Sequence, residues 1–162
     1  MRALSICVLA LLLSACDSGE LDTPRRGQFE AEVSGDLSRS LSGAARFGRL
    51  PAGPGEDRTL TISLLDQSDP FRSITVVDDD GVLGGEGTYR LGSESLGLLY
   101  SDGLASEGAT YSADSGTLRL TRYDDDRITG SLTADLAPAF GGAGGRASVS
   151  STFDAVFLPT PF

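Results

Sequence analysis

The chain has 162 residues, of which 23 are acidic and 13 basic, with a formal net charge of −10 and no histidine or tryptophan. The acidic excess argues against binding to nucleic acid or to anionic lipids. Without histidine, a Ser-His-Asp or Cys-His catalytic relay and the usual zinc sites are excluded, and no cofactor is expected.

An apolar segment opens the chain. Arg2 precedes residues 3–13, ALSICVLALLL, which match the apolar part of a signal peptide in length. The segment is too short to cross a bilayer as a helix, which takes about 20 apolar residues. Two small residues and then Cys16 follow it. The pattern predicts a leader over residues 1–15 that is removed on export.

The residues Leu13, Ser14, Ala15 and Cys16 resemble the lipobox of bacterial lipoproteins. The resemblance implies that the Cys16 thiol receives a diacylglyceryl group, that the leader is cut before it, and that the new amine is acylated, as with palmitate. Several acyl chains anchor a protein stably, whereas one does not. The implied location is the bacterial cell envelope, on the inner or the outer membrane. A plain secretory leader or a buried N-terminal helix is the alternative.

Residues 17–26, DSGELDTPRR, are polar and contain one proline. We expect residues 16–27 to form the lipidated cysteine and a flexible tether, and residues 28–162 to form one folded domain. The other cysteine, Cys7, lies in the leader, so the processed chain would contain no disulfide.

From residue 28 onward, apolar and polar residues alternate with the period of two that indicates half-buried strands. The alternation places one apolar set on the buried face: Phe29, Ala31, Val33, Leu41, Gly43, Ala45, Phe47, Leu60, Ile62, Leu64, Ile74 and Val76. Shorter strands are predicted at GTYRLG, LGLLYS and ATYSA.

Residues 116–136, GTLRLTRYDDDRITGSLTADL, predict a hairpin with its turn at residues 124–126. Arg119 and Thr121 should face outward. The predicted inward residues of the hairpin and of the last strand are Leu118, Leu120, Ile128, Leu132, Ala134, Leu136, Val149, Phe153, Ala155 and Phe157.

No segment shows a helical period, and Gly and Asp clusters recur every 8–12 residues. The sequence therefore predicts an all-β fold, a single antiparallel β-sandwich or barrel-like domain of about ten short strands.

Several strand motifs occur in a fixed order: FEAEVSG from Phe29, GTYRL from Gly87, GTLRLT from Gly116 and DRITG from Asp126, followed by an alternating strand to Phe157. This order resembles a family of uncharacterised β-sandwich lipoproteins of Gram-negative bacteria. Leu132 stands where that family usually has phenylalanine. The resemblance implies the fold and the lipid anchor, and it brings no catalytic residues.

The stretch VVDDDG, residues 76–81, invites a calcium interpretation. With Gly81 at position six of an EF-hand loop, positions one and twelve would be Val76 and Gly87, so the ligand pattern fails at both ends. A looser cation site from Asp78, Asp80 and Glu86 stays open beside a solvated hairpin turn.

The expected function is that of a membrane-anchored envelope lipoprotein with a non-catalytic binding or structural domain. Its partner would be a protein or a glycan, besides the membrane that holds Cys16. A carboxylate-dependent hydrolase such as a glycosidase, or a weak calcium-binding module, is the alternative. The four tyrosines either line a ligand cleft or belong to the core.

Overall fold

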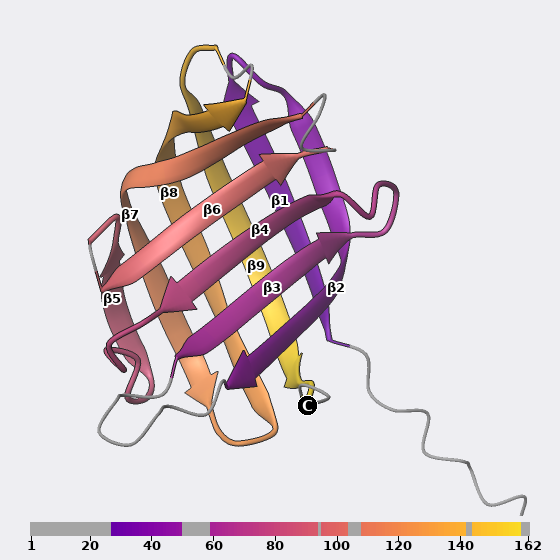
Figure 1. Ribbon diagram of the computed structural model, residues 1–162. Helices are drawn as coiled ribbons and strands as arrows, with labels where there is room; N and C mark the ends of the chain where they lie inside the picture. Colours follow the sequence, from indigo (N-terminus) through magenta and orange to yellow (C-terminus); the bar gives the residue numbers. More distant parts are fainter. Residues whose placement is uncertain (1–26, 50–58, 94, 104–107, 142–143, 160–162) are drawn as a thin grey trace, which may run out of the picture.

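The computed structural model describes residues 27–49, 59–93, 95–103, 108–141 and 144–159. These residues form nine strands and their connections (Figure 1). The strands are β1 (Gln28–Gly35), β2 (Arg39–Arg49), β3 (Leu60–Asp66), β4 (Arg72–Asp78), β5 (Gly87–Leu91), β6 (Leu96–Asp102), β7 (Ala109–Tyr123), β8 (Arg127–Gly141) and β9 (Ala147–Phe157).

The sheet closes on itself. Its hydrogen-bonded order runs β7-β6-β4-β3-β2-β1-β9-β8, and β8 pairs again with β7, so eight antiparallel strands form a barrel. The ninth strand, β5, pairs with residues 116–120 of β7, beyond the residues 109–112 that pair with β6. The all-β prediction is confirmed, and of the two architectures left open the structure is the barrel.

Strand β7 is longer than the sequence suggested. The segments ATYSA and GTLRL, predicted as separate strands, both belong to this strand of 15 residues. The intervening residues form no turn; instead the register with β8 shifts between Ala113 and Ser115. Such a bulge bends a strand without ending it, so β7 can follow β6 along one stretch and β5 along the next.

The inward side chains fill the barrel with an apolar core. Every member of the apolar set predicted for β1 to β4 is buried except Gly43, which is partly exposed. The predictions for the β7–β8 hairpin are likewise confirmed, with Arg119 and Thr121 exposed. Phe157 was predicted to be buried and is 38% exposed. By alternation Phe157 lies on the inward side of β9, but β9 ends at this residue, at the open end of the barrel.

The first strand enters the wall between β2 and β9. Gly27 accepts a hydrogen bond from Ala45 N–H, and a Cβ on Gly27 would lie 2.0 Å from the Ala45 carbonyl oxygen, so only glycine fits. Beyond this point β2 and β9 pair directly, with Phe47 opposite Phe157. We call the end of the barrel at which Gly27 lies the entry end. At this end Leu158 N–H also donates a hydrogen bond to Phe47 O.

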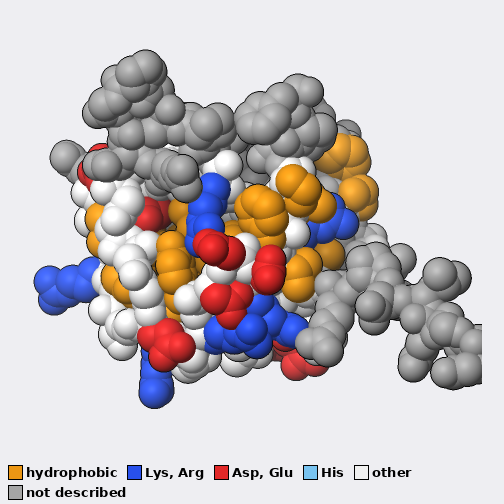
Figure 2. All heavy atoms as spheres, turned by 90° about the horizontal axis from the view of Figure 1, so that it is seen from below, with side chains coloured by type: hydrophobic (Ala, Val, Ile, Leu, Met, Phe, Trp, Pro, Cys, Tyr) orange, Lys and Arg blue, Asp and Glu red, His pale blue; other side chains and the backbone are white. Residues whose placement is uncertain are grey.

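Viewed onto the entry end, the surface mixes hydrophobic, arginine and acidic side chains (Figure 2). The opposite end, where β3 and β6 end and β4 begins, is the distal end. Among the described residues there is no helix long and apolar enough to span a membrane.

Candidate functional site

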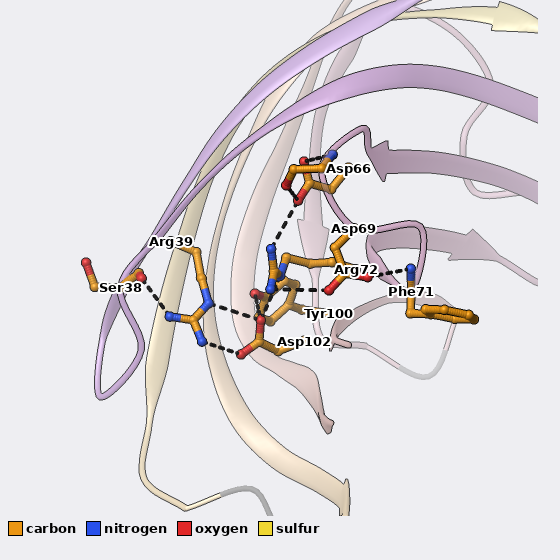
Figure 3. Close-up of polar contacts among 9 residues, drawn as sticks. Ser38, Arg39, Asp66, Asp69, Phe71, Arg72, Tyr100 and Asp102 are labelled. Atoms are coloured by element: carbon orange, nitrogen blue, oxygen red, sulfur yellow. Dashed lines mark hydrogen bonds and ion pairs between the residues drawn. The ribbon is translucent and has the colours of Figure 1, made fainter. Parts of the chain in front are cut away.

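A network of charged side chains lies at the distal end, with Arg72 at its centre (Figure 3). Arg72 Nε donates to Asp102 Oδ1 at 2.8 Å, and Arg72 Nη1 donates to Asp66 Oδ2 at 3.2 Å. Asp69 makes a longer contact with Arg72 Nη2, at 3.4 Å. Arg72 and Asp102 lie directly opposite each other on β4 and β6, so the sheet register brings this pair together.

Both carboxylates are also bound by other groups. Arg39, which begins β2, contacts the two oxygens of Asp102 at 3.3 and 3.2 Å, and the Tyr100 hydroxyl donates to Asp102 Oδ1 at 3.0 Å. The backbone N–H and the hydroxyl of Ser68 donate to Asp66 at 3.3 and 2.7 Å. Every buried side-chain nitrogen or oxygen within the described residues has a hydrogen-bond partner, so the network is saturated.

These contacts determine the charge of the network. Burial works to raise the pKa of Asp66 and of Asp102, but hydrogen bonds from Ser68, Tyr100 and Arg72 outweigh it, and both pKa values lie below the ordinary range. Burial and the charge of Asp102 raise the pKa of Tyr100, so its hydroxyl remains a donor. A general acid at neutral pH needs a raised carboxyl pKa. The network is therefore suited to joining strand ends rather than to donating protons.

The three acids of the predicted cation site lie at the end of β4 and in the loop after it. Asp78 is buried, and its Oδ1 and Oδ2 accept the backbone N–H groups of Val82 at 2.8 Å and Leu83 at 2.9 Å. Both oxygens thus hold the loop in place. Asp80 and Glu86 are exposed. In the part of the chain that the structure describes, no three acidic side chains are grouped to hold a metal ion.

Asp78→Ala should lower the free energy of unfolding by about 1–3 kcal/mol, because the N–H groups of Val82 and of the buried Leu83 lose their acceptor. The exposed neighbour provides the control: Asp80→Ala should cost less than about 0.5 kcal/mol. Urea denaturation measures both. The melting temperature should also show no shift specific to calcium, compared with magnesium and sodium at equal ionic strength. A calcium-specific rise that both variants lose would show that these acids do bind the ion.

The turn between β7 and β8 is built on Asp124. Its Oδ1 accepts the backbone N–H groups of Asp126 at 3.0 Å and Arg127 at 2.7 Å, and Arg122 Nε donates to its Oδ2 at 2.6 Å. The hydrogen bond from Arg122 and those from the turn lower the pKa of Asp124. The predicted role of this acidic stretch as a hairpin turn is confirmed.

The tyrosines do not line one common surface. Tyr100 and Tyr111 are buried, with stacked rings whose centroids lie 6.1 Å apart. Tyr89 and Tyr123 are partly buried and pack against the same core. The core interpretation therefore applies to these residues.

An open groove runs along the outer face of β8, β9, β1 and β2. It consists of three adjoining hollows, the largest of about 720 Å³. The first and second hollows share Glu30, Ser42 and Thr152, and the second and third share Glu32 and Ser150. The hollows therefore follow one another along the strands as one groove, which we call the wall groove.

Small side chains and hydroxyl groups line the wall groove. Outward residues that line it are Ser34, Ser40, Ser42, Thr129, Thr133, Ser148, Ser150 and Thr152. The carboxylate of Glu30, in the middle of the groove, has a hydroxyl neighbour on each adjoining strand. Ser42 on β2 and Thr152 on β9 lie opposite Glu30. These residues alternate in the sequence with the buried set, but alternation carries no signal that their surface is hollowed.

Cys16, the predicted lipidation site, lies outside the described residues. No family model, curated protein or solved structure matches the chain.

Proposed function

We propose that this protein is a membrane-anchored lipoprotein of the bacterial cell envelope, and that its barrel binds a partner without catalysing a reaction. The observation that carries the proposal is the sequence Leu13-Ser14-Ala15-Cys16 at the end of an apolar leader. Lipid on this cysteine holds the chain on a membrane without a spanning helix.

The place where the chain enters the barrel supports an exposed binding domain. Residues 17–26 separate Cys16 from Gly27, and this distance is at most about 40 Å when the chain is fully extended. Since Gly27 lies at the entry end, we expect that end to be the one nearer the membrane. The wall groove begins beside Gly27 and extends along the strands away from it, so it stays open to the aqueous side.

The state of the acidic residues supports binding over hydrolysis. A glycosidase uses a pair of carboxyl groups, one of which is protonated to act as the acid. The two carboxylates that come together at the distal end, Asp66 and Asp102, share Arg72 and have lowered pKa values. The core is filled with apolar side chains, which directs a ligand to the outer surface.

Cys16→Ser should move the protein from the membrane fraction to the soluble fraction, because the acceptor of the lipid is lost. The measurement is fractionation of cells in high salt, followed by detection of the protein in each fraction. Ser18→Ala, two residues farther along, is the control and should leave the protein on the membrane. If Cys16→Ser still sediments quantitatively with membranes, a different anchor holds the chain.

A further inference from the structure

The wall groove contains three carboxylates that no arginine neutralises within the described residues: Glu30, Glu32 and, in the third hollow, Asp135, which accepts the Ser115 hydroxyl at 3.2 Å. Glu30 has no hydrogen bond or ion pair from a described side chain, and Glu32 accepts only the Ser40 hydroxyl, at 2.8 Å. By contrast, Asp154 at the edge of the groove is held by Arg127 through two oxygens, which lowers its pKa. Glu30 and Glu32 are both exposed. The centre of the groove therefore has two free negative charges.

The spacing of these charges matches an extended peptide. Glu30 and Glu32 are two residues apart on β1 and point to the same face. Their separation along the strand is about 6.6–6.8 Å. Side chains on one face of any other extended chain recur at the same interval. A peptide lying along the groove with basic residues at alternate positions places one positive charge beside each glutamate.

The lining of the groove suits the backbone of such a peptide. Ser40 and Ser150 lie beside Glu32 on the neighbouring strands. Hydroxyl groups both donate and accept hydrogen bonds, so they can pair with the N–H and C=O groups of an extended chain. Small residues permit close approach of a second backbone.

We propose that the wall groove binds an extended peptide segment with lysine or arginine at every second position. The proposal rests on the binding role proposed above and gives the partner its chemistry. Complementary charge sets this choice: the protein has a net charge of −10, and the charges in the groove that no described arginine neutralises are all carboxylates. A neutral glycan would leave both glutamates without a counter-charge.

The test is calorimetric titration of the lipidated protein in detergent micelles with two blocked hexapeptides of equal composition and charge. One alternates, Lys-Ser-Lys-Ser-Lys-Ser, and the other, Lys-Lys-Ser-Ser-Lys-Ser, has no two lysines that are two residues apart. The alternating peptide should bind about five- to tenfold more tightly, since it alone engages both glutamates in an extended form. Its affinity should fall as salt is added, because the contacts are exposed ion pairs.

Two double variants with equal changes in net charge locate the site. Glu30→Gln with Glu32→Gln should remove the preference for the alternating peptide. Asp80→Asn with Glu86→Gln, at exposed positions outside the groove, should retain it. Melting temperatures close to that of the unchanged protein will show that each variant is folded.

Equal affinity for the two peptides, or an unaltered preference after the two glutamates are replaced, would overturn the proposal. Tighter binding of spermidine than of the alternating peptide would also overturn it, and would assign the groove to small polyamines. If neither peptide binds while the protein still requires Cys16 to reach the membrane, the groove proposal fails and the anchor stands.

Discussion

Phe153→Ala is expected to lower the free energy of unfolding by about 3–5 kcal/mol, the range for removing a fully buried phenylalanine ring. Phe153 is 3% exposed and lies opposite Phe29 on β1 and Gly130 on β8. A Cβ on Gly130 would lie 3.1 Å from the Phe153 ring, so the glycine makes room for it. Truncation leaves a cavity between three strands that cannot collapse, because their hydrogen bonds fix their positions.

The matched control for Phe153 is Arg119→Ala on the outward face of β7. Arg119 is exposed and its loss should cost less than about 0.5 kcal/mol. Urea denaturation of the two variants gives both losses in the free energy of unfolding. The comparison holds when this free energy falls with urea concentration at the same slope in both variants. Similar shifts in the two midpoints would mean that β7 and β9 do not have the inward and outward faces described above.

Arg72→Ala is expected to lower the free energy of unfolding by about 2–4 kcal/mol, because it leaves Asp66 and Asp102 without their shared partner. The side chains of these acids are 2% and 10% exposed, whereas that of Arg72 is 20% exposed. The partial exposure of the arginine keeps the expected loss below the largest values for buried pairs. Arg146→Ala, whose side chain is 73% exposed beside Asp114, should cost less than about 0.5 kcal/mol.

The dependence on pH separates the charge of Arg72 from its packing. The pKa values of Asp66 and Asp102 are lower in the folded protein than in the unfolded chain, where an aspartate titrates near about 3.9. Their contribution to stability is therefore fully present above about pH 4 and is lost as the pH falls through the folded pKa values. The difference between the unchanged protein and Arg72→Ala should shrink as the pH falls from about 4 toward the folded pKa values. A constant difference over that interval would assign the effect of Arg72 to packing alone.

The strands of the barrel wall were predictable because burial on one face imposes a period of two. Leu60, Ile62 and Leu64 illustrate this, since each is buried and each was placed by alternation alone. The closure into a barrel was not predictable, because it depends on β8 pairing with both β7 and β9. Alternation also fails at the ends of strands, where an inward residue such as Phe157 can reach solvent.

The polar sites were less predictable than the core. Asp66, Arg72 and Asp102 meet because β3, β4 and β6 are adjacent strands, and the register of their pairing brings these residues to the same end. No local sequence motif marks those pairings. The acids that the sequence did mark, Asp78 and Asp124, accept backbone hydrogen bonds in turns. Glu30 and Glu32 alternate with the buried residues of β1 and are exposed, as a period of two requires. That face is hollow because small hydroxyl residues from four strands adjoin it, and only their arrangement in space shows this.

The most direct test of a lipid-anchored barrel is the intact mass of the protein purified from bacterial membranes with detergent. We expect a chain that begins at Cys16, with added mass equal to a diacylglyceryl group and one amide-linked fatty acid. Fragmentation should locate all of this added mass on Cys16. A chain that retains residues 1–15, or one that is cut elsewhere and has an unmodified Cys16, would contradict the proposed lipid anchor.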